Sequence, residues 1–246
     1  MSKARVLSTN ILKIIACVSM FCDHMGLLIF PSVTFLRIIG RLAYPLFAFA
    51  LAEGCHYTKN RLKHFLLIFG MAVIIQLVYI LAMKDYSLSI FMAFSISVIL
   101  IYLYDYIEKM TVKIINSEET KVKDIIIWVL VILSFLTIIT GTFLFDTFTP
   151  YLAPSFGYQG VLIPVIVYIV IKLTNRKLLI GVIAMAVLII VSAILRKEYY
   201  NLFQLLAVPL LLMYNDTRGK YNLKYFFYIF YPLHILLLYV ISIIVK

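Results

Sequence analysis

Charged residues are scarce in this sequence: they make up 13% of its 246 residues, whereas 64% are hydrophobic. About a quarter of the residues of a soluble globular domain are charged, so this chain lacks the polar side chains that would cover it in water. Glycine and proline are also few, nine and seven, which excludes a collagen-like or disordered chain. The apolar runs are too long for porin-type strands of about 10 residues. These absences predict an all-α, polytopic transmembrane bundle, a single integral membrane domain over 1–246.

Cysteine and the common catalytic motifs contribute little. The three cysteines, Cys17, Cys22 and Cys55, are odd in number and form no CxxC pair, so they are interpreted as small buried hydrophobic residues. There is no HExxH helix, glycine-rich phosphate loop or nucleophile-elbow serine. No span carries regularly spaced arginines, and no pair of broken helices recurs as in transporter repeats. We therefore expect no metal site and no permanently bound cofactor.

Apolar windows of about 20 residues, the length that crosses a bilayer as a helix, predict nine spans. They are 7–30, 33–56, 62–83, 87–108, 124–145, 157–174, 177–195, 199–214 and 223–244. The first follows Lys3 and Arg5 but is longer than the apolar core of a secretory signal and has no small-residue cleavage site, so it is expected to be an uncleaved span.

The formal net charge of +11 is interpreted through its placement. Lys and Arg cluster in short connections between the apolar runs rather than in a basic stripe, so no nucleic-acid partner is expected. With the amino terminus in the cytoplasm, 15 of the 22 Lys and Arg lie on the cytoplasmic side and 4 on the outer side. The positive-inside bias therefore predicts a cytoplasmic amino terminus and an outer carboxyl terminus. We expect the protein in the plasma (inner) membrane.

Two ionisable residues share one face of the first predicted span. Lys13 and His24 are eleven residues apart, three helical turns, and so about 16 Å apart along the axis. Met20 lies between them on the same stripe. An ionisable side chain in a span costs a few kcal/mol and therefore normally faces a partner or a cavity. A cation near the inner surface with an imidazole beyond it can follow an extended acyl-CoA; alternatively, Lys13 extends to lipid phosphates and His24 is a packing residue.

The neighbouring Asp23 is expected to pair with an arginine of the second span. Arg37 and Arg41 are four residues apart and so share a helical face. The turn at 31–32 is short enough to place that face level with Asp23 and His24. One carboxylate between two arginines leaves one net positive charge, which could stabilise an anionic group or a developing oxyanion.

Three further polar residues complete the set of candidates. Glu53 near the inner end of the second span is expected to pair with Lys59 or Arg61, or with Lys13 across the hairpin. In the last span, His234 follows Tyr231 by three residues, so both lie on one side of the helix, beside the irregularity that Pro232 causes. These residues form a second candidate wall of the same pocket, or they are packing residues.

The sequence resembles the TraX family over nearly its whole length, most weakly over about 65–145. The resemblance is carried by Asp23-His24-Met25-Gly26, by Arg37-Ile38-Ile39-Gly40-Arg41 and by four other blocks, 12–16, 42–54, 157–160 and 214–234. A basic residue followed after ten residues by a histidine, as in Lys13 and His24, is also remotely similar to the membrane acyltransferase 3 superfamily.

The resemblance implies a membrane acyltransferase, since the named member of the family acetylates the amino terminus of pilin subunits. Acetyl-CoA or another acyl-CoA is then the donor, and a peptide, pilin-like or glycan group is the acceptor. The expected catalytic residues are His24 as base, with Asp23, Arg37, Arg41 and His234. The expected donor-binding residues are Lys13, Glu53, Lys59, Arg61, Arg218, Lys220 and Tyr231.

Two other classes of function fit the same residues. A small proton-coupled transporter could use Asp23, His24 and the arginines as a proton relay. A non-catalytic partner in the assembly of a secretion or pilus system could use them only for helix association.

Overall fold

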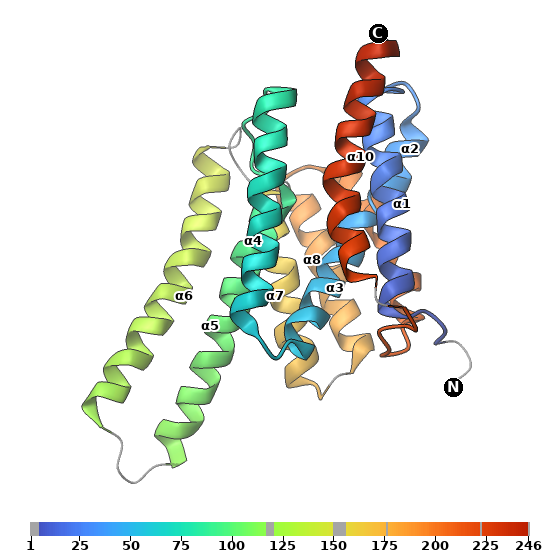
Figure 1. The fold of residues 1–246 in the computed structure, drawn as a ribbon. Coiled ribbons are helices and arrows are strands. Elements are labelled where there is room, and N and C mark those ends of the chain that lie inside the picture. Colours follow the sequence, from blue (N-terminus) through green and yellow to red (C-terminus); the bar gives the residue numbers. More distant parts are fainter. Residues whose placement is uncertain (1–4, 117–120, 150–155, 176, 222, 246) are drawn as a thin grey trace.

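A computed structural model describes residues 5–116, 121–149, 156–175, 177–221 and 223–245 as a bundle of helices (Figure 1). Lys3 and Arg176, two of the cations counted on the cytoplasmic side, lie outside the described residues, as does Lys246. The elements are α1 (Thr9–Leu28), α2 (Thr34–Gly40), α3 (Ala43–Tyr57), α4 (Arg61–Val78), η1 (Tyr79–Met83), α5 (Ile90–Asn116), α6 (Val122–Phe148), α7 (Gly157–Leu173), α8 (Leu178–Leu195), η2 (Tyr199–Ala207), α9 (Val208–Leu212) and α10 (Lys224–Val245).

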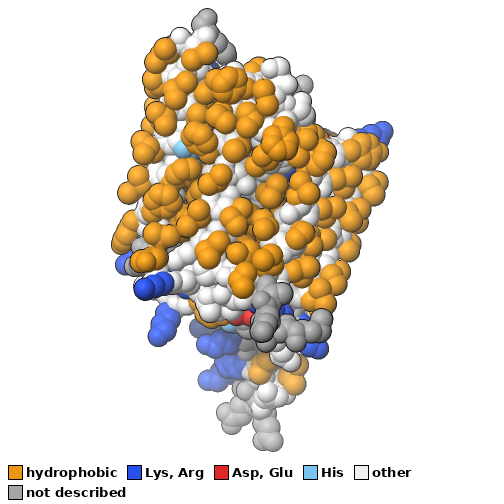
Figure 2. All heavy atoms as spheres, turned by 90° about the vertical axis from the view of Figure 1, so that its right-hand side faces the viewer, with side chains coloured by type: hydrophobic (Ala, Val, Ile, Leu, Met, Phe, Trp, Pro, Cys, Tyr) orange, Lys and Arg blue, Asp and Glu red, His pale blue; other side chains and the backbone are white. Residues whose placement is uncertain are grey.

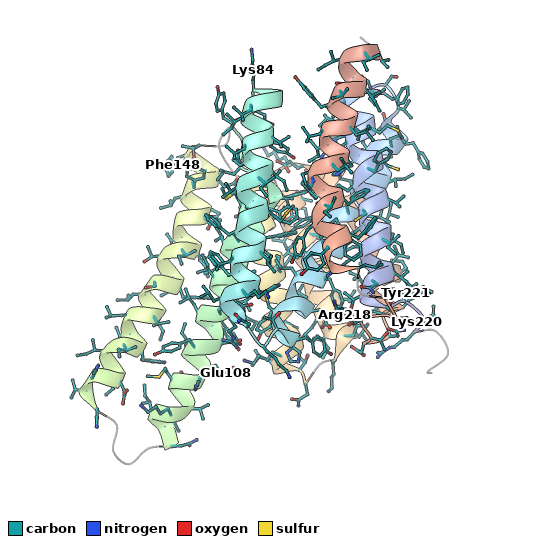
Figure 3. The ribbon with its side chains drawn as sticks, in the orientation of Figure 1. Lys84, Glu108, Phe148, Arg218, Lys220 and Tyr221 are labelled. Carbon is teal, nitrogen blue, oxygen red and sulfur yellow. The ribbon has the colours of Figure 1, made fainter. Side chains whose placement is uncertain are left out.

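The all-α prediction is confirmed for the described residues, and the chain is a multi-pass membrane protein by its helices. Seven helical segments are long and apolar enough to cross a bilayer, and two shorter apolar ones, Gly157–Leu173 and Tyr199–Leu212, fall at the sixth and eighth predicted spans. The amino and carboxyl termini lie at opposite ends of the bundle (Figure 1). Lys84 and Phe148 mark one end and Glu108, Arg218 and Lys220 the other (Figure 3).

The second and eighth predicted spans, 33–56 and 199–214, agree with the apolar segments Thr34–Tyr57 and Tyr199–Leu212, but neither is one regular α-helix. The second span is two helices, α2 and α3, with Arg41 and Leu42 between them; Pro45, in the first turn of α3, fits there because its missing N–H has no helical acceptor in that turn. The longest predicted connection, 109–123, is mostly helix, because α5 continues to Asn116. The eighth span begins as the 3-10 helix η2 and becomes α-helical only at Val208.

The helices differ in how much of their surface is covered by protein. The main core cluster joins α1, α3, α5, α7 and α8. By contrast, only 6% of the residues in the apolar stretch of α6 are buried. Large aliphatic and aromatic side chains of α6 are exposed along its length, as lipid-facing residues of a membrane protein are. Figure 2 shows the face formed largely by α1 and α10: hydrophobic side chains cover most of it, and most of its Lys and Arg gather at the lower end.

The connection between α9 and α10 wraps around the start of α1. Leu7 forms an isolated parallel bridge with Tyr214, and the N–H groups of Thr9 and Asn10 donate to the carbonyls of Thr217 and Arg218. These bonds satisfy donors at an amino-terminal helix end, where no carbonyl of the helix can reach them. The same contacts bring Arg218 beside the end of α1 that carries Lys13.

A buried carboxylate at the same end of the bundle joins three helices. Asp105 of α5 accepts hydrogen bonds from Arg61 of α4 at 2.5 Å and from Tyr168 and Lys172 of α7 at 2.9 and 2.7 Å. Lys172 also pairs with Glu108, one turn further along α5. The side chain of Asp105 is 5% exposed and that of Glu108 40%, so the two carboxylates differ in how much water solvates them.

This difference predicts unequal costs of neutralising the two carboxylates. Asp105→Asn removes the buried carboxylate that Arg61, Tyr168 and Lys172 share, and should lower the free energy of unfolding by about 2 kcal/mol, mainly through the buried hydrogen bonds that it loses. The matched variant Glu108→Gln, which removes a more exposed pair, should change it by less than about 1 kcal/mol. Thermal unfolding of the purified protein in detergent compares the two; equal effects would contradict the structural role given to Asp105.

Candidate active site

One stripe of α1 faces two cavities inside the bundle. One cavity, which we call the histidine cavity, has a volume of about 390 Å³. The α1 residues that line it include Met20, Asp23, His24 and Leu27. The lysine cavity, of about 600 Å³, is lined by Thr9, Asn10, Lys13, Cys17 and Met20. The predicted face of α1 therefore lines the interior, but Lys13 and His24 lie in different cavities rather than along one open track.

The two cavities extend toward opposite ends of the bundle. Asp85, Arg196 and Glu198, in the connections after η1 and α8, line the histidine cavity, and Asp85 is exposed. Exposed Asp216 and Arg218 line the lysine cavity. Lys84, next to Asp85, and Arg218 lie at opposite ends of the molecule (Figure 3), so each cavity reaches a different end.

The charged centre of the histidine cavity is one carboxylate held by two arginines. Asp23 of α1 accepts from Nη1 of Arg37 at 2.9 Å and from Nη2 of Arg41 at 2.8 Å. The side chains of Asp23 and Arg41 are 18% and 11% exposed. The predicted pairing of Asp23 is thus present with both arginines, one from α2 and one from the break before α3, and the cluster keeps one net positive charge.

Close helix contact makes this arrangement possible. A Cβ built on Gly40 would overlap the Cβ and the carboxylate of Asp23. Only glycine, which has no side chain, lets the end of α2 approach α1 this closely. Arg41 follows at once and lies between the rings of Phe156 and Tyr200, 5.5 and 5.4 Å from their centroids, which orients its guanidinium.

The two membrane histidines form a directed hydrogen-bond chain. Nδ1 of His234 lies 2.9 Å from the carbonyl oxygen of Phe230, and Nε2 of His234 lies 2.9 Å from Nδ1 of His24. A carbonyl only accepts, so Nδ1 of His234 carries a proton and, in the neutral ring, Nε2 accepts from Nδ1 of His24. The remaining nitrogen, Nε2 of His24, then holds a free lone pair on a residue that lines the cavity.

The far wall of the histidine cavity carries a second charged group. Arg196, at the end of α8, pairs with Asp146 of α6 and with Glu198 at 2.9 Å, and Asn201 donates to Glu198 at 2.7 Å. Two carboxylates on one arginine give this wall the opposite net charge to the Asp23 cluster. The cavity as a whole is therefore close to charge-balanced.

The lysine cavity combines cations with one strongly buried carboxylate. Glu53 of α3 is 4% exposed and accepts from the hydroxyl of Tyr214 at 2.9 Å; burial raises the pKa of that phenol, so it keeps its proton and donates. Lys13 lies 5.6 Å from the ring centroid of Phe227 of α10. Arg218, from the connection before α10, lines the same cavity.

The structure separates the predicted site residues into three groups. Asp23, His24, Arg37 and Arg41 line the histidine cavity, Lys13, Glu53 and Arg218 line the lysine cavity, and Tyr231 lines both. His234 contacts the first cavity through His24. Among the described lining residues, neither cavity includes Lys59, Arg61 or Lys220. Arg61 pairs with Asp105 rather than serving as the expected partner of Glu53.

Several lining residues were missed from the sequence. Asp85, Arg196, Glu198 and Tyr214 lie outside the predicted spans or at their edges, where charged and polar residues are ordinary. Asp105, which supports the lysine-cavity end, lies within the predicted span 87–108, so its charge in an apolar window could have identified it.

These features define a multi-pass helical membrane protein with two cavities that carry charged residues in their walls, one of them built around an imidazole and a shared Asp–Arg cluster. A model of the TraX protein family matches residues 8–242. The chain therefore belongs to the TraX family, as the sequence blocks predicted.

Other comparisons cover less of the chain. The "Uncharacterized protein RP591" of Rickettsia prowazekii (strain Madrid E) is 36% identical over 77 residues, which are 31% of this chain and 29% of that protein. The matched segment thus spans under a third of the relative. No solved structure matches this chain.

The contact at Gly40 gives a direct test of the site's construction. Gly40→Ala should force α2 away from Asp23 and break the shared ion pair, lowering the melting temperature and detergent stability by the equivalent of about 3 kcal/mol. Gly70→Ala on α4 is the matched control, since nothing lies within 4 Å of the position that its added methyl group would take; alanine there should stabilise the helix by up to about 1 kcal/mol. A tolerated Gly40→Ala variant would show that the close approach is dispensable.

Proposed function

We propose that this protein is an integral membrane acyltransferase that moves an acyl group from acyl-CoA, bound at the amino-terminal end of α1, to an acceptor at the opposite end. The observation that carries the proposal is the free Nε2 lone pair of His24, held by His234 beside two arginines that share one carboxylate. Membership in the TraX family supports the same reaction class.

His24 serves as the general base in this proposal. Its Nε2 takes the proton of an acceptor amine or hydroxyl as that nitrogen or oxygen attacks the thioester carbon. The carbon–sulfur bond breaks, and the proton passes from His24 to the leaving thiolate, so that CoA departs as the thiol. His234 holds His24 in the tautomer whose Nε2 can accept a proton, because the Nδ1 proton of His234 is donated to the carbonyl of Phe230.

The arginine pair supplies charge stabilisation. Attack on a thioester places negative charge on the carbonyl oxygen, and a fixed cation near that oxygen is worth most where water is excluded. The Asp23 cluster has one positive charge in excess, and among the described residues the buried Nε of Arg41 has no hydrogen-bond partner. Arg41 is therefore the favoured oxyanion donor, with Asp23 and Arg37 fixing its position.

The lysine cavity is the proposed donor site. Its volume is within the range of small-molecule pockets, and Lys13 and Arg218 are suited to the phosphates of CoA. The excess of Lys and Arg at this end favours a cytoplasmic position in the plasma membrane. The acceptor then approaches the histidine cavity from outside, and family resemblance favours a peptide amino terminus over a glycan hydroxyl.

Replacing the base tests the reaction. With purified protein and acetyl-CoA as the probe, His24→Ala should reduce release of free CoA by about 10²- to 10⁴-fold, the usual contribution of a general base. His56→Ala, which changes an exposed histidine lining neither cavity among the described residues, is the control and should keep the rate of the unaltered protein. Undiminished cleavage by His24→Ala, or no cleavage by the unaltered protein with any acyl-CoA and amine tried, would refute the proposal.

Replacing the cation tests the donor site. Lys13→Ala should raise KM for acetyl-CoA on the order of tenfold and leave kcat nearly unchanged, because a phosphate contact remote from the thioester contributes equally to ground and transition states. Lys109→Ala removes an exposed cation of α5 at the same end and should alter neither constant. A fall in kcat with constant KM would instead place Lys13 at the reacting atoms.

A further inference from the structure

The two cavities end on the same side chains. Met20, Phe47, Phe91, Phe94 and Tyr231 line both the histidine cavity and the lysine cavity. They come from four helices, α1, α3, α5 and α10, and we call them the partition. Because each cavity extends toward a different end of the bundle, the partition lies between the two ends.

The partition is packed and apolar. Phe91 lies at its centre, with its ring in edge contact with Tyr231 at 4.6 Å and with Phe94 at 6.0 Å between centroids. Met20, Phe94 and Tyr231 are buried, and Met20 and Tyr231 form a hydrophobic cluster against which Phe47 and Phe91 pack. Contacts among the four aromatic rings and the Met20 thioether thus separate the histidine cavity from the lysine cavity.

The residues on either side are polar. The Asp23 cluster and His24 lie beyond the partition in one direction, and Lys13 and Glu53 lie beyond it in the other. Two cavities with charged residues in their walls that approach each other from opposite ends of the bundle would conduct protons and ions if water joined them. A narrow apolar constriction prevents this, because water does not stably fill it.

We propose that the partition seals the membrane between the two cavities and admits only the uncharged thioester end of the donor, and that Met20 and Phe91, which also line the histidine cavity, limit the length of the acyl chain that fits there. The second part rests on the proposed function; the seal does not. In the transfer reaction the thioester end passes Met20 toward His24, while the charged part of CoA stays in the lysine cavity. A longer acyl chain must displace Phe91 and is disfavoured.

The seal is tested without any acyl donor. In proteoliposomes of neutral phospholipid carrying a potassium diffusion potential, Phe91→Ala should raise the proton leak by about tenfold or more over the unaltered protein, because it opens the constriction to water. Phe91→Leu keeps apolar bulk and should stay tight. Phe69→Ala is the matched control, since Phe69 on α4 is 40% exposed and lines neither cavity among the described residues.

A second variant keeps this test decisive. If Phe91→Ala elutes as aggregate, Met20→Ala opens the same constriction from α1. A leak no greater than that of the Phe69→Ala control, in every one of these two variants that elutes as folded protein, would overturn the seal.

Chain-length selection is measured with acetyl-CoA and butyryl-CoA. Phe91→Ala should raise the ratio of kcat/KM for butyryl over acetyl donor on the order of tenfold, the discrimination that one or two methylenes give in an apolar pocket. An unchanged ratio in an active, leaky variant would overturn the selector while supporting the seal. If the unaltered protein cleaves neither donor, the proposed function and the selector both fail, and the leak alone decides the seal.

Discussion

The shared ion pair of Asp23 with Arg37 and Arg41 is the interaction on which the candidate site depends. A lone carboxylate at this depth would be too costly to keep charged, and the two guanidiniums compensate for its lost hydration with short hydrogen bonds. The pair also joins helices that meet at the site. Because Arg37 belongs to α2 and Arg41 to the break before α3, one carboxylate ties both to α1, and Gly40 provides the space. His24, next to Asp23, takes its place in the cavity from this contact.

The parts of the site that the sequence predicted are those governed by local geometry. Helical periodicity is fixed, so Lys13, Met20 and His24 had to share a stripe. The short connection at 29–33, though longer than the predicted turn at 31–32, brings Arg37 and Arg41 to Asp23. The contacts of His234 and Arg218 with α1 join residues about 200 positions apart. His234 entered the predicted set as an ionisable residue within a span, and Arg218 through the family resemblance. Neither period nor turn length specifies their contacts with α1.

The main departure from expectation is the division of one expected track into two cavities. On α1 alone nothing separates Lys13 from His24, and Met20 looks like any apolar residue of the stripe. The separation is made by Phe47, Phe91, Phe94 and Tyr231, which belong to three other helices. Single-helix patterns do not show which aromatic side chains meet, because lipid-facing and core-facing phenylalanines are equally apolar.

Separation of the cavities also suits the energetics of the proposed reaction. CoA carries phosphates whose transfer into an apolar region costs many kcal/mol, whereas an acyl group of a few carbons crosses such a region at little cost or with a gain. An apolar partition therefore distinguishes the two halves of the donor by charge alone. A hydrated channel wide enough for both would lose this distinction and would also conduct protons past His24. Placing the imidazole beyond the partition, rather than beside Lys13, lets one side chain meet both the acyl carbon and an acceptor that never crosses the membrane.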